Sequence, residues 1–233
     1  MQAIIPAAGR GTRLRPLTDE TPKGLVSVAG RPLLAYVFER LTSLPIDEVI
    51  VVVGYEGEQI VTRFGSTVNG LPVEYVWQAS QHGLAHALHQ ARDLIDGSFV
   101  VLNGDNVFCD PIPPVQMVDA DGAILVESVS PDQARTTGVV VTDEEGLVSD
   151  IVEKPPNPPS TLSTTGVYYL PEATMAACAT IEPSNTGEYE LAAALRTLIA
   201  DGMTIRAIPF SGWRQNVNTP ADIRRVEAQL SSA

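Results

Sequence analysis

Short, continuous apolar runs alternate with longer helical patterns through the first half of the chain. The runs have the length of β-strands: QAIIPA (2–7), DEVIVVVGY (47–55), PVEYVW (72–77) and SFVVLNGD (98–105). The segments between them repeat apolar residues with helical spacing: RPLLAYVFERLTSL (31–44), EGEQIVTRF (56–64) and GLAHALHQARDLI (83–95). Apolar strands separated by helices are typical of βαβ units and of a parallel sheet buried on both faces. We therefore predict an α/β core with a doubly wound, mostly parallel, Rossmann-like sheet.

The second half of the chain has a more extended pattern. Strands are predicted at AILVESV (123–129), GVVVTDEEGLVSDIVEKP (138–155) and TGVYYL (165–170), and helices at PEATMAACAT (171–180), GEYELAAALRTLIADG (187–202) and TPADIRRVEAQL (219–230). DEEG (143–146) indicates a hairpin tip, and PPNPP (155–159) indicates a stiff loop that cannot join a sheet. Thr219 is the expected N-cap of the last helix, with Pro220 at its first position and Asp222 at its third.

The charge balance restricts the kinds of partner. Acidic residues outnumber basic ones by 28 to 15, for a net charge of −13. Nucleic-acid and anionic-membrane binding both need a basic face, so neither is expected. An acidic excess with arginine far above lysine is typical of salt-loving organisms, although G+C-rich coding also raises arginine. The two cysteines give no disulfide framework, and the apolar run that starts at Met1 is too short for a signal peptide or a membrane span, so we expect a cytoplasmic protein.

A glycine-rich segment, AAGRGT (7–12), follows the first strand. The small side chains of Ala8, Gly9 and Gly11 let backbone N–H groups approach a ligand, which is how an anion-binding nest forms. Arg13 and Lys23 add positive charge close by in sequence. The third glycine of a dinucleotide fingerprint and the Gly-Lys-Ser/Thr of a P-loop are both missing, which excludes those two phosphate loops. A simple tight turn after a strand is the alternative interpretation.

The segment GTRLRPLTDETPK (11–23) resembles the opening motif of the sugar-1-phosphate nucleotidylyltransferases, and the resemblance extends over nearly the whole chain. It is closest to the glucose-1-phosphate uridylyl- and thymidylyltransferases, including archaeal enzymes of surface-glycan assembly. The resemblance implies the nucleotide-diphospho-sugar transferase fold with an inserted β-hairpin region on the sugar side. It also implies that the loop from Ala8 to Arg13, including Thr12, wraps the triphosphate, and that Lys23 neutralises phosphate.

The same resemblance suggests one domain over residues 1–233, with a nucleotide-binding half at 1–110 and a sugar-phosphate-binding half at 111–233. We expect no hexapeptide array after this core.

The segment WQASQHGLAHAL (77–88) resembles the nucleobase reader of this family. A glutamine side chain offers both a donor and an acceptor, so Gln78 suits the O4/N3–H edge of uracil or thymine. Gly83 would let the base lie against the backbone. The three histidines of this region have no acidic or cysteine ligand nearby in sequence, so we expect no zinc site there.

Asp105 ends a buried strand, where ligands usually bind in an open α/β sheet. It resembles the magnesium ligand of the family, although an ordinary turn residue is the alternative. Asn216 stands where the family has a second metal carboxylate, and Asn218 is the weaker candidate for that role. An amide oxygen can still ligate magnesium, with less charge.

The sugar side is implied by the resemblance alone. The residues are Gly138, Glu153, Lys154, Gly166, Glu188 and Trp213. The two glutamates would accept hydrogen bonds from sugar hydroxyls, and Lys154 would hold the sugar phosphate. Lys154 and Lys23 are the only lysines of the chain, and both could still be accidental surface residues. Thr186 departs from the arginine that many relatives have there.

We therefore expect a magnesium-dependent enzyme that joins UTP or dTTP to a sugar 1-phosphate, glucose 1-phosphate first among them, and releases pyrophosphate. Arg13, Lys23, Lys154 and Asp105 are its expected catalytic residues. The alternatives are the same chemistry on an amino sugar, mannose or phosphocholine, or a weak paralogue that binds nucleotide sugar and regulates a partner. The expected partners are these small-molecule substrates, and the sequence is compatible with a homo-oligomer.

Overall fold

The computed structural model describes residues 1–114 and 119–232. The chain divides into two compact units, each built from separate stretches of sequence. Among the described residues, the first unit holds 1–81, 102–114 and 212–232, and the second holds 82–101 and 119–211. None of the described helices is long and apolar enough to cross a membrane.

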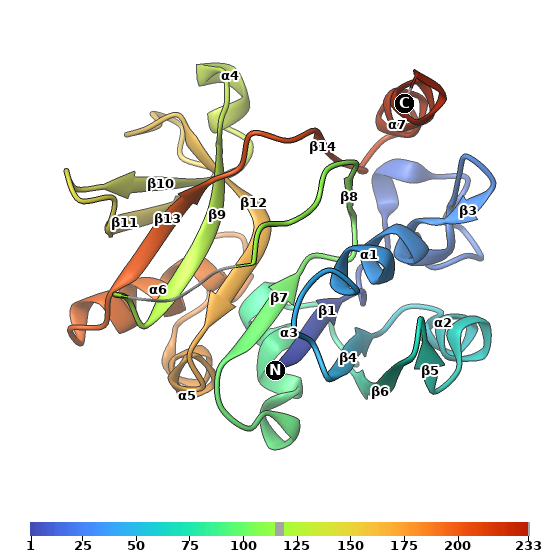
Figure 1. The fold of residues 1–233 in the computed structure, drawn as a ribbon, viewed down its shortest axis with the longest axis horizontal. Helices are drawn as coiled ribbons and strands as arrows, with labels where there is room; N and C mark the ends of the chain where they lie inside the picture. Colours follow the sequence, from blue (N-terminus) through green and yellow to red (C-terminus); the bar gives the residue numbers. More distant parts are fainter. Residues whose placement is uncertain (115–118, 233) are drawn as a thin grey trace. The chain divides into compact units, whose positions relative to one another are not determined.

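Parallel strands form the centre of the first unit (Figure 1). β4 (Glu48–Val53) lies between β1 (Gln2–Pro6) and β6 (Leu71–Trp77), parallel to both. The short β5 (Thr67–Val68) pairs with β6 in the antiparallel sense. Residues 49–53 of β4 are fully buried, as a continuous run of β-branched residues predicts for a strand covered on both faces.

The helices α1 (Leu33–Leu41) and α2 (Gly57–Phe64) connect these strands, which confirms the predicted βαβ pattern. Two short helical turns, η1 (Thr12–Leu14) and η2 (Lys23–Leu25), and the hairpin of β2 (Ser27–Val28) and β3 (Arg31–Pro32) fill the long connection after β1.

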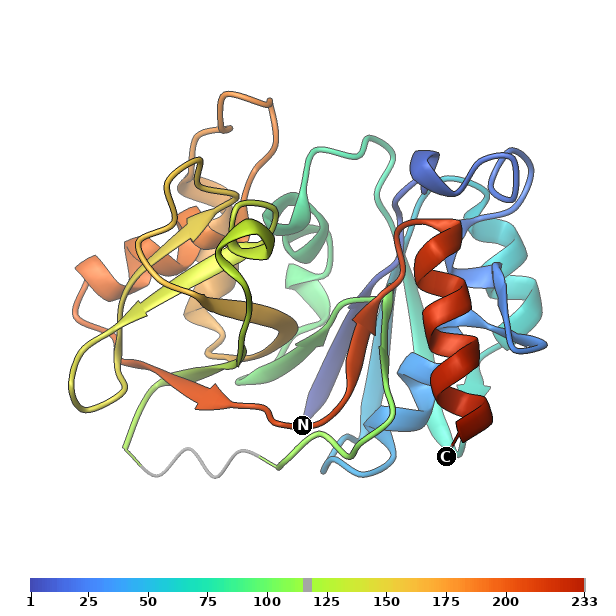
Figure 2. The same cartoon turned by 90° about the horizontal axis from the view of Figure 1, so that it is seen from above.

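Two later segments of sequence complete the first unit. β8 (Asn106–Phe108) pairs antiparallel with β14 (Arg214–Asn216), and α7 (Pro220–Ser232) follows. Figure 2 shows α7 alongside the β2–β3 region. A buried apolar cluster joins these parts: Leu14, Val26, Val28, Leu33, Tyr36, Val107, Val217, Ile223 and Val226.

The predicted start of α7 is confirmed in detail. Thr219 Oγ1 accepts a hydrogen bond from the backbone N–H of Asp222 at 3.3 Å, and Asp222 Oδ2 accepts one from the backbone N–H of Thr219 at 2.8 Å. This reciprocal pair is a capping box with aspartate in the place of glutamate. Pro220 is the first helical residue.

Antiparallel pairing dominates the second unit. β12 (Leu162–Leu170) pairs antiparallel with β9 (Gly122–Ser128) and with β10 (Gly138–Thr142), and β13 (Ile205–Pro209) runs parallel to β9. β10 and β11 (Val148–Glu153) form the hairpin that the DEEG segment predicts. The remaining elements are α3 (Leu84–Gln90), η3 (Arg92–Leu94), β7 (Phe99–Leu102), α4 (Pro131–Ala134), α5 (Ala173–Thr180) and α6 (Leu191–Ala200).

The helix predicted from Gly187 begins only at Leu191. The reason is a pair of hydrogen bonds to a distant segment. Tyr189 N donates to His82 O at 2.7 Å, and Ala85 N donates to Tyr189 O at 3.0 Å. Backbone groups engaged in this way are not available for the first helical turn.

Candidate active site

The loop after β1 has free backbone donors. Within residues 1–114 and 119–232, no hydrogen bond uses the backbone N–H groups of residues 9–13. Gly9 has open space where a Cβ would stand, and Gly11 has a left-handed φ of 62°. Consecutive unused donors of this kind form an anion-binding site.

Two residues that the sequence reasoning missed hold this loop in place. A Cβ on Gly54 would come within 2.9 Å of Ala8, so only glycine lets the loop lie against the end of β4. Thr18 is 2% exposed, and its Oγ1 donates to Gly11 O at 2.8 Å. A glycine directly after a buried strand is a signal that could have identified Gly54. Thr18 belongs to the GTRLRPLTDETPK segment, and that motif could have identified it.

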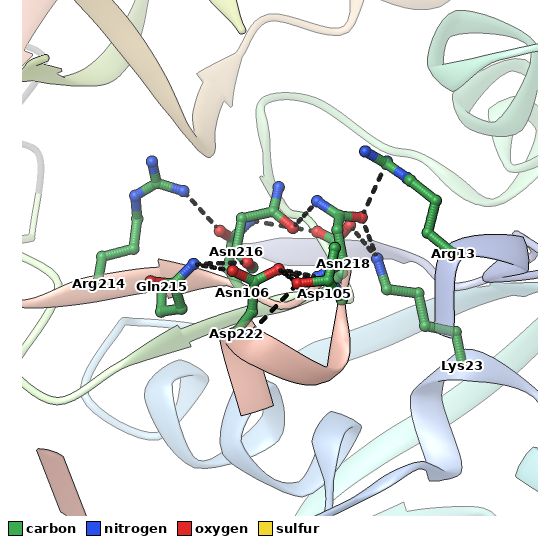
Figure 3. A network of polar contacts seen from close by, with 10 residues as sticks. Arg13, Lys23, Asp105, Asn106, Arg214, Gln215, Asn216, Asn218 and Asp222 are labelled. Atoms are coloured by element: carbon green, nitrogen blue, oxygen red, sulfur yellow. Dashed lines mark hydrogen bonds and ion pairs between the residues drawn. The ribbon is translucent and has the colours of Figure 1, made fainter. Parts of the chain in front are cut away.

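Lys23 and Asp105 meet beside this loop (Figure 3). Lys23 Nζ lies 2.7 Å from Asp105 Oδ2, with the two side chains 13% and 27% exposed. Gly104 positions Asp105, because its backbone N–H donates to Pro6 O at 3.2 Å and a Cβ there would stand 2.7 Å from the same oxygen. The structure therefore brings the predicted Lys23 and Asp105 together at the carboxyl end of β1.

Two asparagines extend the network from the other side (Figure 3). Asn218 Oδ1 accepts from Lys23 Nζ at 2.8 Å and from Arg13 Nη2 at 3.2 Å. Asn218 Nδ2 donates to Asn216 Oδ1 at 2.7 Å. Asn218, the weaker candidate from sequence, thus makes the direct contacts with both cations, whereas Asn216 reaches them through Asn218.

The donor set suits a hard cation such as magnesium. Asp105 offers a carboxylate, Asn216 offers an amide oxygen, and Val217 N donates to Asp105 O at 2.8 Å, which ties the two segments together. Magnesium typically takes one or two protein oxygens and completes its shell with water and substrate phosphates. Among the described residues no group of three or more His, Cys, Asp or Glu side chains gathers at one place. The remaining ligands of a bound Mg²⁺ would therefore be water and substrate phosphate oxygens.

Gln78 lies at the end of β6 in the first unit, 3% exposed, with its backbone N–H donating to Val53 O at 2.8 Å. Gly83 lies in the second unit, and the structure gives it a local reason to be glycine. Its φ is 99°, and a Cβ would come within 2.6 Å of Tyr189 O. Contact between Gly83 and a base stays a prediction.

Two of the histidines near Gly83 are in ring contact. The rings of His82 and His86 are 5.3 Å apart in an edge-to-face arrangement. Burial, with smaller contributions from His82 and His89, lowers the pKa of His86 and so favours its neutral form.

Three of the predicted sugar-side residues meet in the second unit. Lys154 Nζ lies 3.0 Å from Glu153 Oε1, and Gly138 leaves room for that glutamate, since a Cβ there would be 2.9 Å from Glu153 Oε2. Lys154 has a left-handed φ of 44°, and its backbone N–H donates to Thr137 O at 3.0 Å. This unusual conformation in a non-glycine residue is typical of functional positions.

The other three predicted sugar-side residues lie elsewhere. Gly166, with a φ of 83°, lies where the β12–β9 register shifts. Glu188 precedes the backbone contact between Tyr189 and His82 and packs beside Gly83. Trp213 belongs to the first unit, where it packs against the apolar cluster around α7 and donates its backbone N–H to Asp110 Oδ2 at 2.6 Å.

The chain has clear relatives. A sequence model of the nucleotidyl transferase family matches residues 2–231. The UTP–glucose-1-phosphate uridylyltransferase AglF of Haloferax volcanii is 44% identical over 234 residues, which cover 99% of this chain and 96% of that protein.

Two solved structures share the architecture. One, from Bacillus anthracis and assigned as a glucose-1-phosphate thymidylyltransferase, contains sucrose. It has a TM-score of 0.89 and 27% identity, covering 100% of this chain and 96% of that one. A UDP-glucose pyrophosphorylase with bound UDP-glucose has a TM-score of 0.89 and 24% identity, covering 99% and 98%. This second likeness shows the fold alone. Together the two structures confirm the predicted fold class.

Proposed function

Because the chain belongs to the nucleotidyl transferase family, we propose that it joins UTP or dTTP to a sugar 1-phosphate and releases pyrophosphate. The similarity to AglF, named as a UTP–glucose-1-phosphate uridylyltransferase, favours UTP and glucose 1-phosphate. The observation that carries the proposal is the cluster of Arg13, Lys23 and Asp105 beside a loop whose backbone donors are unused. This combination suits a triphosphate with a bound divalent cation.

In the proposed reaction a phosphate oxygen of the sugar 1-phosphate attacks the α-phosphorus of the triphosphate in line. The bond from the α-phosphorus to the bridging oxygen breaks, and pyrophosphate leaves with the electron pair. Catalysis of this kind depends on positioning and on charge stabilisation. The backbone N–H groups of residues 9–13, together with Arg13 and Lys23, bind the triphosphate and stabilise the charge that develops on its oxygens.

Asp105 and Asn216 would hold Mg²⁺. When bound, it would supply Lewis-acid stabilisation and a template for the phosphates.

The acceptor side is proposed for the second unit. Lys154 would hold the sugar phosphate, and Glu153 and Glu188 would accept hydrogen bonds from sugar hydroxyls. Gln78 would read the pyrimidine edge through its amide. We place the enzyme in the cytoplasm, as one domain with a nucleotide-binding and a sugar-binding half.

A pyrophosphate-release assay tests the proposal directly. UTP and dTTP are each combined with glucose 1-phosphate, glucosamine 1-phosphate, N-acetylglucosamine 1-phosphate, mannose 1-phosphate and phosphocholine, with and without EDTA. We expect the highest kcat/KM with UTP or dTTP and glucose 1-phosphate, and loss of turnover in EDTA. Preference for another acceptor would reassign the substrate. Tight UDP-glucose binding without turnover would instead indicate a regulatory paralogue, as the departures at Thr186 and Asn216 would suggest.

Lys23→Ala should raise the KM for the triphosphate without lowering the melting temperature by more than a few degrees. Lys23→Arg keeps the charge on a different geometry and should recover part of the affinity. A KM unchanged by Lys23→Ala would remove this residue from the triphosphate site.

A further inference from the structure

The side chain of Asn218 contacts two cationic side chains, Arg13 and Lys23 (Figure 3). Its Oδ1 accepts hydrogen bonds from Lys23 Nζ at 2.8 Å and from Arg13 Nη2 at 3.2 Å. Its Nδ2 donates to Asn216 Oδ1 at 2.7 Å. Since both ends of the amide are engaged, its orientation is determined, with the carbonyl end toward the cations.

The backbone around Asn218 is equally well held. Asn218 N donates to Asp222 Oδ2 at 3.0 Å, and the same oxygen accepts from Thr219 N at 2.8 Å in the capping box of α7. On its other side, Val217 is fully buried and donates its N–H to Asp105 O at 2.8 Å. A side chain projecting from so constrained a segment can hold flexible partners in place.

Charge explains why an amide is useful at this position. Arg13 and Lys23 carry two positive charges, and Asp105 already compensates one of them through the 2.7 Å ion pair. A neutral acceptor orients both donors and leaves the remaining charge for an anionic ligand. A carboxylate at the same place would make two charge-assisted hydrogen bonds and neutralise the cluster.

We propose that Asn218 is a positioning residue that holds Arg13 and Lys23 toward the triphosphate, and that its neutrality preserves their attraction for the phosphates. The inference rests on the proposed function for the roles of Arg13 and Lys23. It assigns Asn218 a task other than metal ligation. Its Oδ1 contacts Lys23 and Arg13 directly, whereas the ligation of Mg²⁺ is proposed for Asp105 and Asn216.

The test uses inorganic triphosphate as the probe, measured by isothermal titration calorimetry on the full chain in EDTA at low and molar KCl. Asn218→Asp should weaken binding by at least tenfold at low salt, with a smaller salt dependence than wild type. Asn218→Ala should weaken it by about fivefold or more, as expected for a lost hydrogen bond, and Asn218→Ser, which keeps a small neutral acceptor, should stay within about twofold. Asn69→Asp adds the same charge at an exposed turn and controls for net charge. Its affinity should match that of wild type.

Melting temperatures separate misfolding from loss of positioning. If Asn218→Asp is unfolded, the affinities of Asn218→Ala and Asn218→Ser for triphosphate still test the proposal. A positioning role predicts that serine, but not alanine, restores most of the wild-type affinity. Binding of triphosphate by a folded Asn218→Asp within twofold of wild type would overturn the proposal, as would equal losses in the alanine and serine variants. The outcome does not depend on turnover. If the wild-type protein binds triphosphate but releases no pyrophosphate, the proposed function is wrong. The binding measurements on the Asn218 variants would still test whether Asn218 positions Arg13 and Lys23.

Discussion

Lys23 and Asp105, separated by 82 positions in sequence, form an ion pair with 2.7 Å between Nζ and Oδ2. The carboxylate proposed to hold magnesium therefore already has a cationic partner in the protein itself. Metal binding at Asp105 would compete with this pair and would leave more of the Lys23 charge for phosphate.

Asp105→Asn should have opposite effects on two measurements. Turnover with Mg²⁺ should fall by roughly 10²-fold or more, because the two proposed ligands would then both be neutral amides. Affinity for inorganic triphosphate in EDTA should rise, because Lys23 loses its counter-charge. Pyrophosphate release and calorimetry measure the two effects. Normal turnover would show that the metal assignment is wrong. Asn216→Asp, the converse change, should keep or raise activity at low magnesium.

Gly83→Ala should be more destabilising than Gly97→Ala, although both glycines have a left-handed φ, of 99° and 87°. Gly97 has open space around a Cβ, so its variant should cost about 1 kcal/mol for the backbone conformation alone. At Gly83 the new Cβ would also meet the Tyr189 backbone at 2.6 Å, so we expect about 3 kcal/mol or more. Urea unfolding of the two variants measures the difference. If both variants lose the same free energy of unfolding, the Tyr189 backbone moves aside without cost.

Lys154→Ala should raise the KM for sugar 1-phosphate and lower kcat, with a combined loss of roughly 10²–10³-fold. Arg135→Ala is the control, since Arg135 is an exposed cation of the same unit, paired with Asp132. Lys154→Gly should lose as much activity but stabilise the fold by up to about 1 kcal/mol relative to alanine, because Lys154 has a φ of 44°. Kinetic constants and melting temperatures check both expectations. Activity within a few fold of wild type would place Lys154 outside the site.

Tyr55 contacts both ends of the segment from Ala8 to Asp19, which includes the glycine-rich loop. Its backbone N–H donates to Ala8 O at 3.3 Å, its hydroxyl donates to Asp19 O, and its ring lies under the Arg10 guanidinium at 4.9 Å. Tyr55→Phe should raise the KM for the triphosphate about fivefold, as expected for one lost hydrogen bond, with little change in kcat.

Tyr75→Phe is the matched control for Tyr55→Phe. Its hydroxyl donates to Gly65 O at 2.6 Å, outside the segment from Ala8 to Asp19. The steady-state KM for UTP in the two variants should therefore differ. Equal KM values would mean that the Tyr55 hydroxyl does not shape the loop.

Salt should stabilise this chain. With 28 acidic and 15 basic residues, repulsion opposes the compact state at low ionic strength, and the Debye length falls from about 10 Å at 0.1 M to about 3 Å at 1 M. We expect the melting temperature to rise by several degrees between 0.1 and 2 M KCl, and the activity optimum to lie in molar salt, although screening weakens triphosphate binding. Calorimetric scans and assays across the same range decide. If the melting temperature does not change between 0.1 and 2 M KCl and activity is highest in dilute salt, the acidic composition reflects coding bias and not adaptation to salt.

Local patterns in the sequence determined the layers of the fold and the ends of several elements. The β-branched run of β4 predicts a strand buried on both faces, and DEEG predicts the turn between β10 and β11. Thr219, Pro220 and Asp222 predict the start of α7. Each of these features depends on residues a few positions apart, so the amino-acid order alone contains the information. The motif around Lys23 and the strand end at Asp105 likewise identified two residues that the structure brings into contact.

Tertiary structure alone decided which side chains meet. Asn218 lies 195 residues from Lys23 and 205 from Arg13, and no local pattern distinguishes it from Asn216 as their partner. The late start of α6 depends on the backbone contact between Tyr189 and His82, which no helical periodicity reveals. Such contacts form only when folding places distant backbone groups within hydrogen-bonding distance. The reason is physical: periodicity records burial along one element, whereas hydrogen bonds across the chain depend on the path of the whole backbone.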